Sequence, residues 1–238
     1  MKTAIILGNG PSLQKLLDFG LENIPKHIDT IGLNSFYRYS EKIKWYPTYI
    51  GSFDVRVTPY HFYDMVKYVE NSNVKKFVCC DWALEYAKAD EEYYTHPKIH
   101  REKNQNGFNP EWYVDLNNMS CSGNAACKFL MKEGYTKIYL IGVDANYVDF
   151  IDGSKRDEGG GLIMDKTPEK NPNYFWDEYQ VEGDEYNVPG KRGHILSWQE
   201  TAHNVKKYKP NIEIINLSDI SEVQFFKFST IEKEFKIK

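Results

Sequence analysis

Short apolar runs of strand length recur along this chain, and they constrain its fold more than any other feature. Several of the runs are continuous rather than alternating, which is typical of strands buried on both faces of a parallel sheet. The runs occupy residues 3–7, 29–33, 48–53, 77–80, 137–141 and 212–215. We therefore expect a mostly parallel β-sheet with both faces covered.

Helical segments are expected between these runs. The clearest begins at Ser122, which is able to cap the helix, and ends before Gly134. A second begins at Ser197, whose spacing to Glu200 forms a capping box, and continues to about Tyr208. Strands that alternate with helices in this way predict an α/β fold with a doubly wound, mostly parallel, Rossmann-like sheet.

One long segment, residues 147–193, interrupts the alternation. It is rich in glycine, proline and acidic residues, yet it keeps many aromatic side chains, among them Tyr147, Tyr174, Phe175, Trp176, Tyr179 and Tyr186. A disordered linker normally lacks aromatic residues, so we expect a lid that folds over a ligand rather than a partly disordered insertion. With 238 residues, 41% of them hydrophobic, the whole chain (1–238) is expected to form a single α/β domain that carries this insertion.

The charge balance and the cysteines exclude several classes of protein. The net charge is −4 and the basic residues are spread along the chain, so no nucleic-acid partner is expected. The four cysteines show no CxxC spacing, which argues against a zinc site or a disulfide framework and for reduced thiols. The first apolar run is too short for a signal peptide or a membrane span, so we expect a cytoplasmic protein.

The C-terminal segment, residues 225–238, is basic and aromatic. Such a tail is able to contact a membrane surface, or a neighbouring subunit in a homo-oligomer. A final edge strand with a solvated end explains the same residues, and we favour that interpretation.

A glycine-rich turn follows the first apolar run and reads Gly8-Asn9-Gly10-Pro11-Ser12-Leu13. Glycine lets a backbone approach a ligand closely, and the N–H groups that open the next helix attract anions. The turn therefore indicates phosphate binding, although a tight turn that serves only the fold explains it equally well. The third glycine of a dinucleotide fingerprint is missing, and the absence of a GxxxxGK[ST] motif argues against an ordinary kinase or ATPase.

Polar residues also follow other predicted strands, where ligands gather in open α/β sheets. They are Asn34 and Ser35, Ser52 and Asp54, and Gly142 and Asp144, with Ser122 at the start of a helix. Each residue alone is more often a cap or a turn residue. Their shared location at the strand ends favours a binding site.

These motifs resemble the bacterial sialyltransferases of glycosyltransferase family 42. They resemble more loosely the domain of motility accessory factors and MptE-like pterin pyrophosphokinases. The matching motifs occur in the same order in residues 5–13, in Asn34-Ser35-Phe36-Tyr37, in Ser122-Gly123, in residues 134–144 and in Gly193-His194. Together they extend over about positions 1 to 215.

The resemblance implies a nucleotide-sugar-binding domain and suggests its site residues. It places the cytidine monophosphate (CMP) of a donor against Gly8, Asn9, Gly10, Ser12, Asn34, Ser122, Gly142 and Asp144. It places His194 on the general base, and Tyr147 is the displaced counterpart of the tyrosine that follows the Gly-x-Asp motif. Two other positions depart from the family: Met119 replaces an arginine, and Gly51 or Ser52 replaces an asparagine.

The function implied is an inverting transfer of a sugar from a CMP-activated donor to a hydroxyl of a surface glycan, with sialic acid or a related acidic sugar as the candidate. No Asp-x-Asp motif occurs, and a monophosphate leaving group has little charge to neutralise, so no metal or other cofactor is expected. Two alternatives stay open. One is a pterin-type pyrophosphokinase, which would need magnesium, and the other is a nucleotide-binding module without turnover.

The residues that flank His194 also single it out, independently of the family resemblance. Gly193 precedes it, the lid ends there, and the helix expected at Ser197 begins just beyond. An imidazole titrates near neutrality and accepts a hydroxyl proton, although a histidine that only organises the helix entry is the alternative. The other five histidines, His61 among them, have no site motif beside them.

Overall fold

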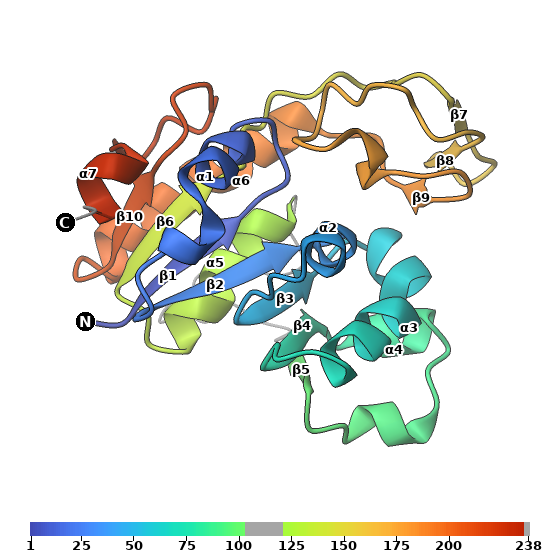
Figure 1. Cartoon of the computed structure of the whole chain (residues 1–238), viewed down its shortest axis with the longest axis horizontal. Coiled ribbons are helices and arrows are strands. Elements are labelled where there is room, and N and C mark those ends of the chain that lie inside the picture. The colour runs from blue at the N-terminus through green and yellow to red at the C-terminus, as the bar shows by residue number, and fades with distance from the viewer. Residues whose placement is uncertain (103–120, 236–238) are drawn as a thin grey trace.

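The computed structural model describes residues 1–102 and 121–235, and its centre is an eight-stranded parallel sheet (Figure 1). The strand order is β11 (Lys227–Phe228), β10 (Glu213–Asn216), β6 (Lys137–Ile141), β1 (Thr3–Leu7), β2 (Ile28–Leu33), β3 (Tyr49–Ser52), β4 (Lys76–Cys80) and β5 (Ile99–Glu102). All six apolar runs are strands of this sheet. The expected doubly wound, Rossmann-like α/β class is therefore confirmed, with β5 and β11 as further edge strands.

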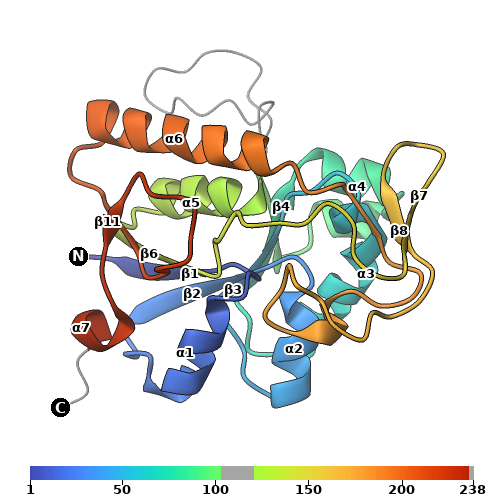
Figure 2. The same ribbon diagram turned by 90° about the horizontal axis from the view of Figure 1, so that it is seen from above.

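Helices cover both faces of the sheet (Figure 2). One face packs against α1 (Leu13–Phe19), α2 (Phe36–Ile43), α3 (Val57–Glu70), α4 (Trp82–Tyr86) and α7 (Ile231–Phe235). The other face packs against α5 (Ser122–Lys132) and α6 (Lys191–Tyr208). In β1, Ile5 and Leu7 enter the first core while Ala4 and Ile6 enter the second. Burial on both sides is the reason that these runs are continuously apolar.

The end of α5 agrees with its sequence, but the expected cap does not. Gly134 has a φ of +83°, and its N–H and that of Tyr135 bond to the carbonyls of Met131 and Leu130 at 3.1 and 3.0 Å. This is a Schellman-type stop. At the other end, Cys121 takes the capping position, and Ser122 lies inside the helix.

The start of α6 was predicted wrongly. The helix begins at Lys191 rather than at Ser197, so the expected capping box lies inside it. The Ser197 carbonyl accepts hydrogen bonds from Thr201 Oγ1 at 2.9 Å and Asn124 Nδ2 at 3.3 Å. Ile195, which precedes the expected start, packs against the core on the same side as the fully buried Trp198. Capping motifs in a sequence carry no information about such tertiary contacts.

The expected lid, residues 147–193, contains a small antiparallel sheet of β7 (Ser154–Arg156), β8 (Leu162–Met164) and β9 (Glu185–Tyr186), but its last three residues belong to α6. We keep the name lid for residues 147–190. Its own apolar cluster is small: Ile151, Leu162, Met164 and Tyr186. Side-chain amides supply further order, because Asn173 bonds both to the N–H of Val148 (2.8 Å) and to its carbonyl (2.9 Å). Buried amides that satisfy backbone groups replace the aliphatic core that this segment lacks.

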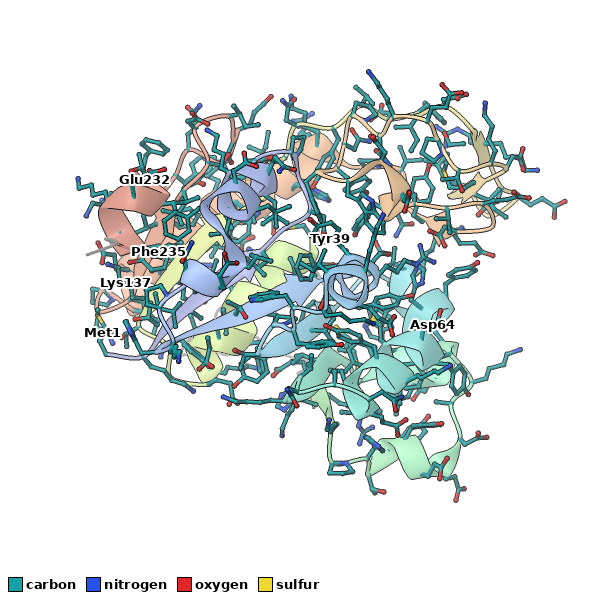
Figure 3. The ribbon with its side chains drawn as sticks, viewed as in Figure 1. Met1, Tyr39, Asp64, Lys137, Glu232 and Phe235 are labelled. Carbon is teal, nitrogen blue, oxygen red and sulfur yellow. The ribbon has the colours of Figure 1, made fainter. Side chains whose placement is uncertain are left out.

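The lid docks on α2 through aromatic side chains. Tyr39, labelled in Figure 3, lies on α2 beneath the lid, with ring centroids 4.9 Å from Phe175 and 5.4 Å from Trp176. Arg38 on the same helix donates hydrogen bonds from both terminal guanidinium nitrogens to the Asp184 carboxylate of the lid, at 2.6 and 2.8 Å. The η5 turn (Asp177–Tyr179) completes this contact.

The described part of the C-terminal segment packs onto the sheet. β11 pairs with β10, and the Phe235 ring, close to Lys137 in Figure 3, lies 5.3 Å from that of Tyr139. The edge strand that the sequence favoured is therefore present. No helix in residues 1–102 and 121–235 is long and apolar enough to cross a bilayer.

Candidate active site

The strand order reverses between β1 and β6, and the loops that leave these two strands touch. After β1 the chain continues outward through β2 to β5, whereas β6 returns to the other side of β1. A Cβ on Gly8 would lie 2.3 Å from the Gly142 carbonyl oxygen, and one on Gly142 equally close to that of Gly8. Both positions therefore require glycine. Ligands bind at such reversals in open α/β sheets.

The N-terminus of α1 already holds a carboxylate from the protein itself. Asp144 accepts hydrogen bonds from the Ser12 N–H (2.8 Å), the Ser12 hydroxyl (2.5 Å) and the Ser218 hydroxyl (2.8 Å). Ser12 and Asp144 are 1% and 2% exposed. The expectation that α1 offers free N–H groups to a phosphate is thus corrected, because an internal anion satisfies the first of them.

A cavity lies at the reversal point, beneath the lid. Of the residues expected in the site, Gly8, Asn9, Gly10, Asn34, Ser122, Gly142, Tyr147 and His194 line it. Ser12 and Asp144 lie behind its wall, where they bind each other. Met119, at the family arginine position, lies outside the described residues.

Two asparagines form much of the cavity floor. Asn34 has a φ of +50°, and its Oδ1 accepts hydrogen bonds from the hydroxyls of Ser52 and Ser122, both at 3.1 Å. Asn9 donates through Nδ2 to the Leu33 carbonyl (2.8 Å) and to the Tyr179 hydroxyl (3.0 Å). Its Oδ1 is buried and has no partner among the described residues. A buried acceptor without a partner is costly, and a ligand donor would satisfy it.

Lid tyrosines form the roof. Tyr174 and Tyr179 stack with ring centroids 3.9 Å apart, and Tyr147 meets His194 edge-to-face at 5.3 Å. Burial raises the pKa values of all three tyrosines, so their hydroxyls keep their protons. Because the Tyr179 oxygen accepts from Asn9, its own proton is available to a ligand oxygen.

His194 lies in the first turn of α6, where its N–H bonds to the Gly190 carbonyl at 3.0 Å. Burial lowers the pKa of its imidazole, and the nearby Asp54 carboxylate opposes part of that shift. At neutral pH the ring is therefore uncharged and able to accept a proton.

The cavity also contains residues that sequence reasoning missed. His61 on α3 lines it, bonds through Nδ1 to the Tyr37 hydroxyl (3.2 Å), and has its pKa lowered to about 4, mainly by burial. Asp184 and Asn187 of the lid also line it. No motif marks these three positions, because only the docking of the lid on α3 brings them together. Asp54 follows the third apolar run, but no motif there predicted that its carboxylate lies near His194.

The described residues show no obvious metal centre. Within residues 1–102 and 121–235, no group of three or more His, Cys, Asp or Glu side chains is placed to hold a metal ion. All four cysteines are free thiols. Burial raises the pKa of the Cys121 thiol, which lines the cavity, to about 11.

No protein-family model and no curated protein matches the chain. Solved structures do match. The sialyltransferase CstII from Campylobacter jejuni in complex with the substrate analogue CMP-3FNeuAc is 19% identical, with a TM-score of 0.51, over 96% of this chain and 86% of that one. Its complex with cytidine-5'-monophosphate gives 19% identity and a TM-score of 0.52, over 96% and 85%.

A second protein has a similar fold. The MAf glycosyltransferase from Magnetospirillum magneticum AMB-1 is 10% identical, with a TM-score of 0.50, over 100% of this chain but 35% of that longer one. At these identities the matches establish a shared fold. The family resemblance seen in the motifs is thereby confirmed at the level of the fold.

Proposed function

We propose that this chain is a glycosyltransferase that moves a sugar from a CMP-activated donor to a hydroxyl of a glycan acceptor. The observation that carries the proposal is the cavity at the strand reversal, where an uncharged His194 faces a floor of amide and hydroxyl groups under a tyrosine roof. Support comes from the CstII fold, because CstII structures hold CMP and a CMP-sugar analogue.

The nucleotide would lie over Asn9, Asn34 and the start of α5. The residues Ser122 and Gly123 open α5 at the cavity wall, and the positive end of an eleven-residue helix favours a phosphate there. The unpartnered Asn9 Oδ1 would accept a hydrogen bond from a nucleotide hydroxyl or amino group.

Transfer would be a single inverting displacement. His194 removes the proton from the acceptor hydroxyl as that oxygen bonds to the anomeric carbon of the donor sugar. The bond from this carbon to the phosphate oxygen breaks, and CMP leaves with the bonding electron pair. The hydroxyls of Tyr147 and Tyr179 would donate hydrogen bonds to the departing phosphate.

The direct test is to incubate the protein with CMP-sugars and, separately, with ATP and a pterin. We expect CMP release in the first reaction and no AMP in the second. AMP formation would favour a pyrophosphokinase instead. Calorimetric binding of CMP without any turnover would indicate a non-catalytic module.

A further inference from the structure

Two residues stand where the resembled family has an asparagine, Gly51 and Ser52, and neither is among the described residues that line the cavity. Gly51 faces the core, because a Cβ there would lie 3.0 Å from the Phe53 ring and 3.1 Å from the Ile31 side chain. Ser52, the last residue of β3, is 0% exposed. A ligand in the cavity therefore does not touch either side chain.

The Ser52 hydroxyl instead bonds to a residue that does line the cavity. It donates to Asn34 Oδ1 at 3.1 Å, and it lies 2.8 Å from the hydroxyl of Thr58 in the first turn of α3. A serine hydroxyl has one proton, so a Ser52 that donates to Asn34 accepts from Thr58. The hydroxyls of Thr58 and Ser52 thus form a relay that runs from α3 to Asn34.

The relay determines which group of the Asn34 amide faces the cavity. Its Oδ1 accepts a second hydrogen bond, from the Ser122 hydroxyl at 3.1 Å, so this oxygen is held by two donors. None of the described residues accepts a hydrogen bond from its Nδ2. Asn34 is half-buried and lines the cavity, so its NH₂ group is available to a ligand.

The backbone of Asn34 is already fixed, with a φ of +50° and its N–H bonded to the Gly51 carbonyl at 2.8 Å. The terminal torsion of an asparagine side chain is broad, and half a turn about it exchanges donor and acceptor. Ser122 lines the cavity, so a ligand oxygen competes for its proton. Because a ligand does not reach Ser52, the bond from Ser52 persists when the site is filled.

We propose that Ser52 is a positioning residue of the nucleotide site. Supported by Thr58, it holds the Asn34 oxygen away from the ligand, so that Nδ2 donates to an acceptor atom of the nucleotide. The inference rests on the CMP-dependent function proposed above. It assigns a role to a position where this chain departs from the resembled family.

The test is calorimetric titration of CMP into the wild-type protein, Ser52→Ala, Ser52→Thr and Ser40→Ala. Ser40 is the matched control, because it is also 0% exposed and lies outside the cavity lining. Its hydroxyl bonds to the Trp45 carbonyl and, at 2.5 Å, to the Tyr68 hydroxyl. Both alanine variants therefore delete a buried serine hydroxyl, but only one of these hydroxyls contacts Asn34.

We expect Ser52→Ala to weaken CMP binding about fivefold, the scale of one hydrogen bond. Ser52→Thr keeps the hydroxyl and should bind CMP within about twofold of the wild type. Ser40→Ala should leave the affinity unchanged. Should Ser52→Ala unfold, Ser52→Cys replaces it, because a thiol fills the same space but donates weakly, and the same loss is expected.

A double-mutant cycle shows whether Ser52 acts through Asn34. Asn34→Ala removes the amide that Ser52 orients, so adding Ser52→Ala to it should cause no further loss of CMP affinity. A merely structural role of Ser52 would produce the same loss in both backgrounds.

The inference is overturned if Ser52→Ala binds CMP like the wild type, or if Ser52→Thr binds as weakly as Ser52→Ala. Equal losses in Ser40→Ala and Ser52→Ala would also overturn it, as would additive losses in the cycle. In each of these cases the wild-type protein still binds CMP. A wild-type protein that does not bind CMP would overturn the proposed function itself, so the two failures are distinguishable.

Discussion

At the scale of single residues, Asn9 and Ser12 belong to the same turn but have different environments. Asn9 lines the cavity, and its buried Oδ1 has no partner among the described residues, while Ser12 lies behind the wall and bonds to Asp144. Asn9→Ala should weaken CMP binding about fivefold, because one hydrogen bond contributes about 1 kcal/mol. Ser12→Ala should instead lower the free energy of unfolding by about 1–3 kcal/mol, because it removes a buried partner of Asp144.

Calorimetry with CMP and denaturant unfolding of both variants separate these effects. A Ser12→Ala protein of normal stability that has lost CMP affinity would return Ser12 to the binding surface. Unaltered CMP affinity in Asn9→Ala would remove Asn9 from it.

His194 provides a second prediction at this scale. His194→Ala should lower turnover by roughly 10² to 10⁴-fold, the usual range for loss of a positioned base, while CMP still binds. His203→Ala is the matched control, because His203 is exposed on the same helix. Near-normal transfer by His194→Ala would show that another group removes the proton.

The pH dependence should carry the signature of His194. A base must be deprotonated, and burial lowers its pKa, so the acid limb of kcat/KM should fall below pH 6.5, the ordinary histidine value. Asp54 opposes that shift, so Asp54→Asn should move the limb to still lower pH. A pH–rate profile of both proteins checks the sign, and a limb that moves upward would contradict it.

At the scale of elements, two ion pairs join the lid to α2 and differ in burial. Side chains of Arg38 and Asp184 are 21% and 4% exposed, whereas those of Lys42 and Glu178 are 56% and 57% exposed. Arg38→Met leaves a buried carboxylate without its cation, which costs about 3 kcal/mol. Lys42→Met should cost less than about 1 kcal/mol.

Limited proteolysis with mapped cleavage sites measures this difference. Arg38→Met should raise cleavage within residues 147–193 by about a hundredfold, because lid opening becomes that much more frequent. Lys42→Met should resemble the wild type. Equal cleavage of the two variants would mean that Arg38 does not hold the lid.

Element types could be predicted from this sequence far better than element ends. Runs buried on both faces identified the six central strands, and the φ > 0 position at Gly134 marked the end of α5. The start of α6 was missed because residues before Ser197, such as Ile195, pack against the core, and no local capping motif marks such a contact. The lid strands were missed because each is only two or three residues long, too short to show an alternating apolar pattern.

At the scale of the whole molecule, the site is assembled from distant parts of the chain. The β1 and β2 ends bring Asn9 and Asn34, the start of α5 brings Ser122, and α6 brings His194. A parallel sheet aligns strand ends, so this half of the cavity could be predicted from sequence. The other half, with His61, Asp184 and Asn187, could not be predicted, because docking of β9 on α3 creates it and no single segment contains it.

The last prediction concerns the whole cavity, and it is that transfer needs no divalent metal. A departing monophosphate would be met by the start of α5 and by the hydroxyls of Tyr147 and Tyr179, so hydrogen bonds would replace a cation. CMP release should therefore persist in EDTA. Asp149→Asn with Asp152→Asn should leave the rate unchanged, because these exposed lid acids lie outside the cavity lining. Activity that disappears with EDTA and returns with magnesium would contradict this, and would favour pyrophosphoryl transfer, which requires metal-bound phosphates.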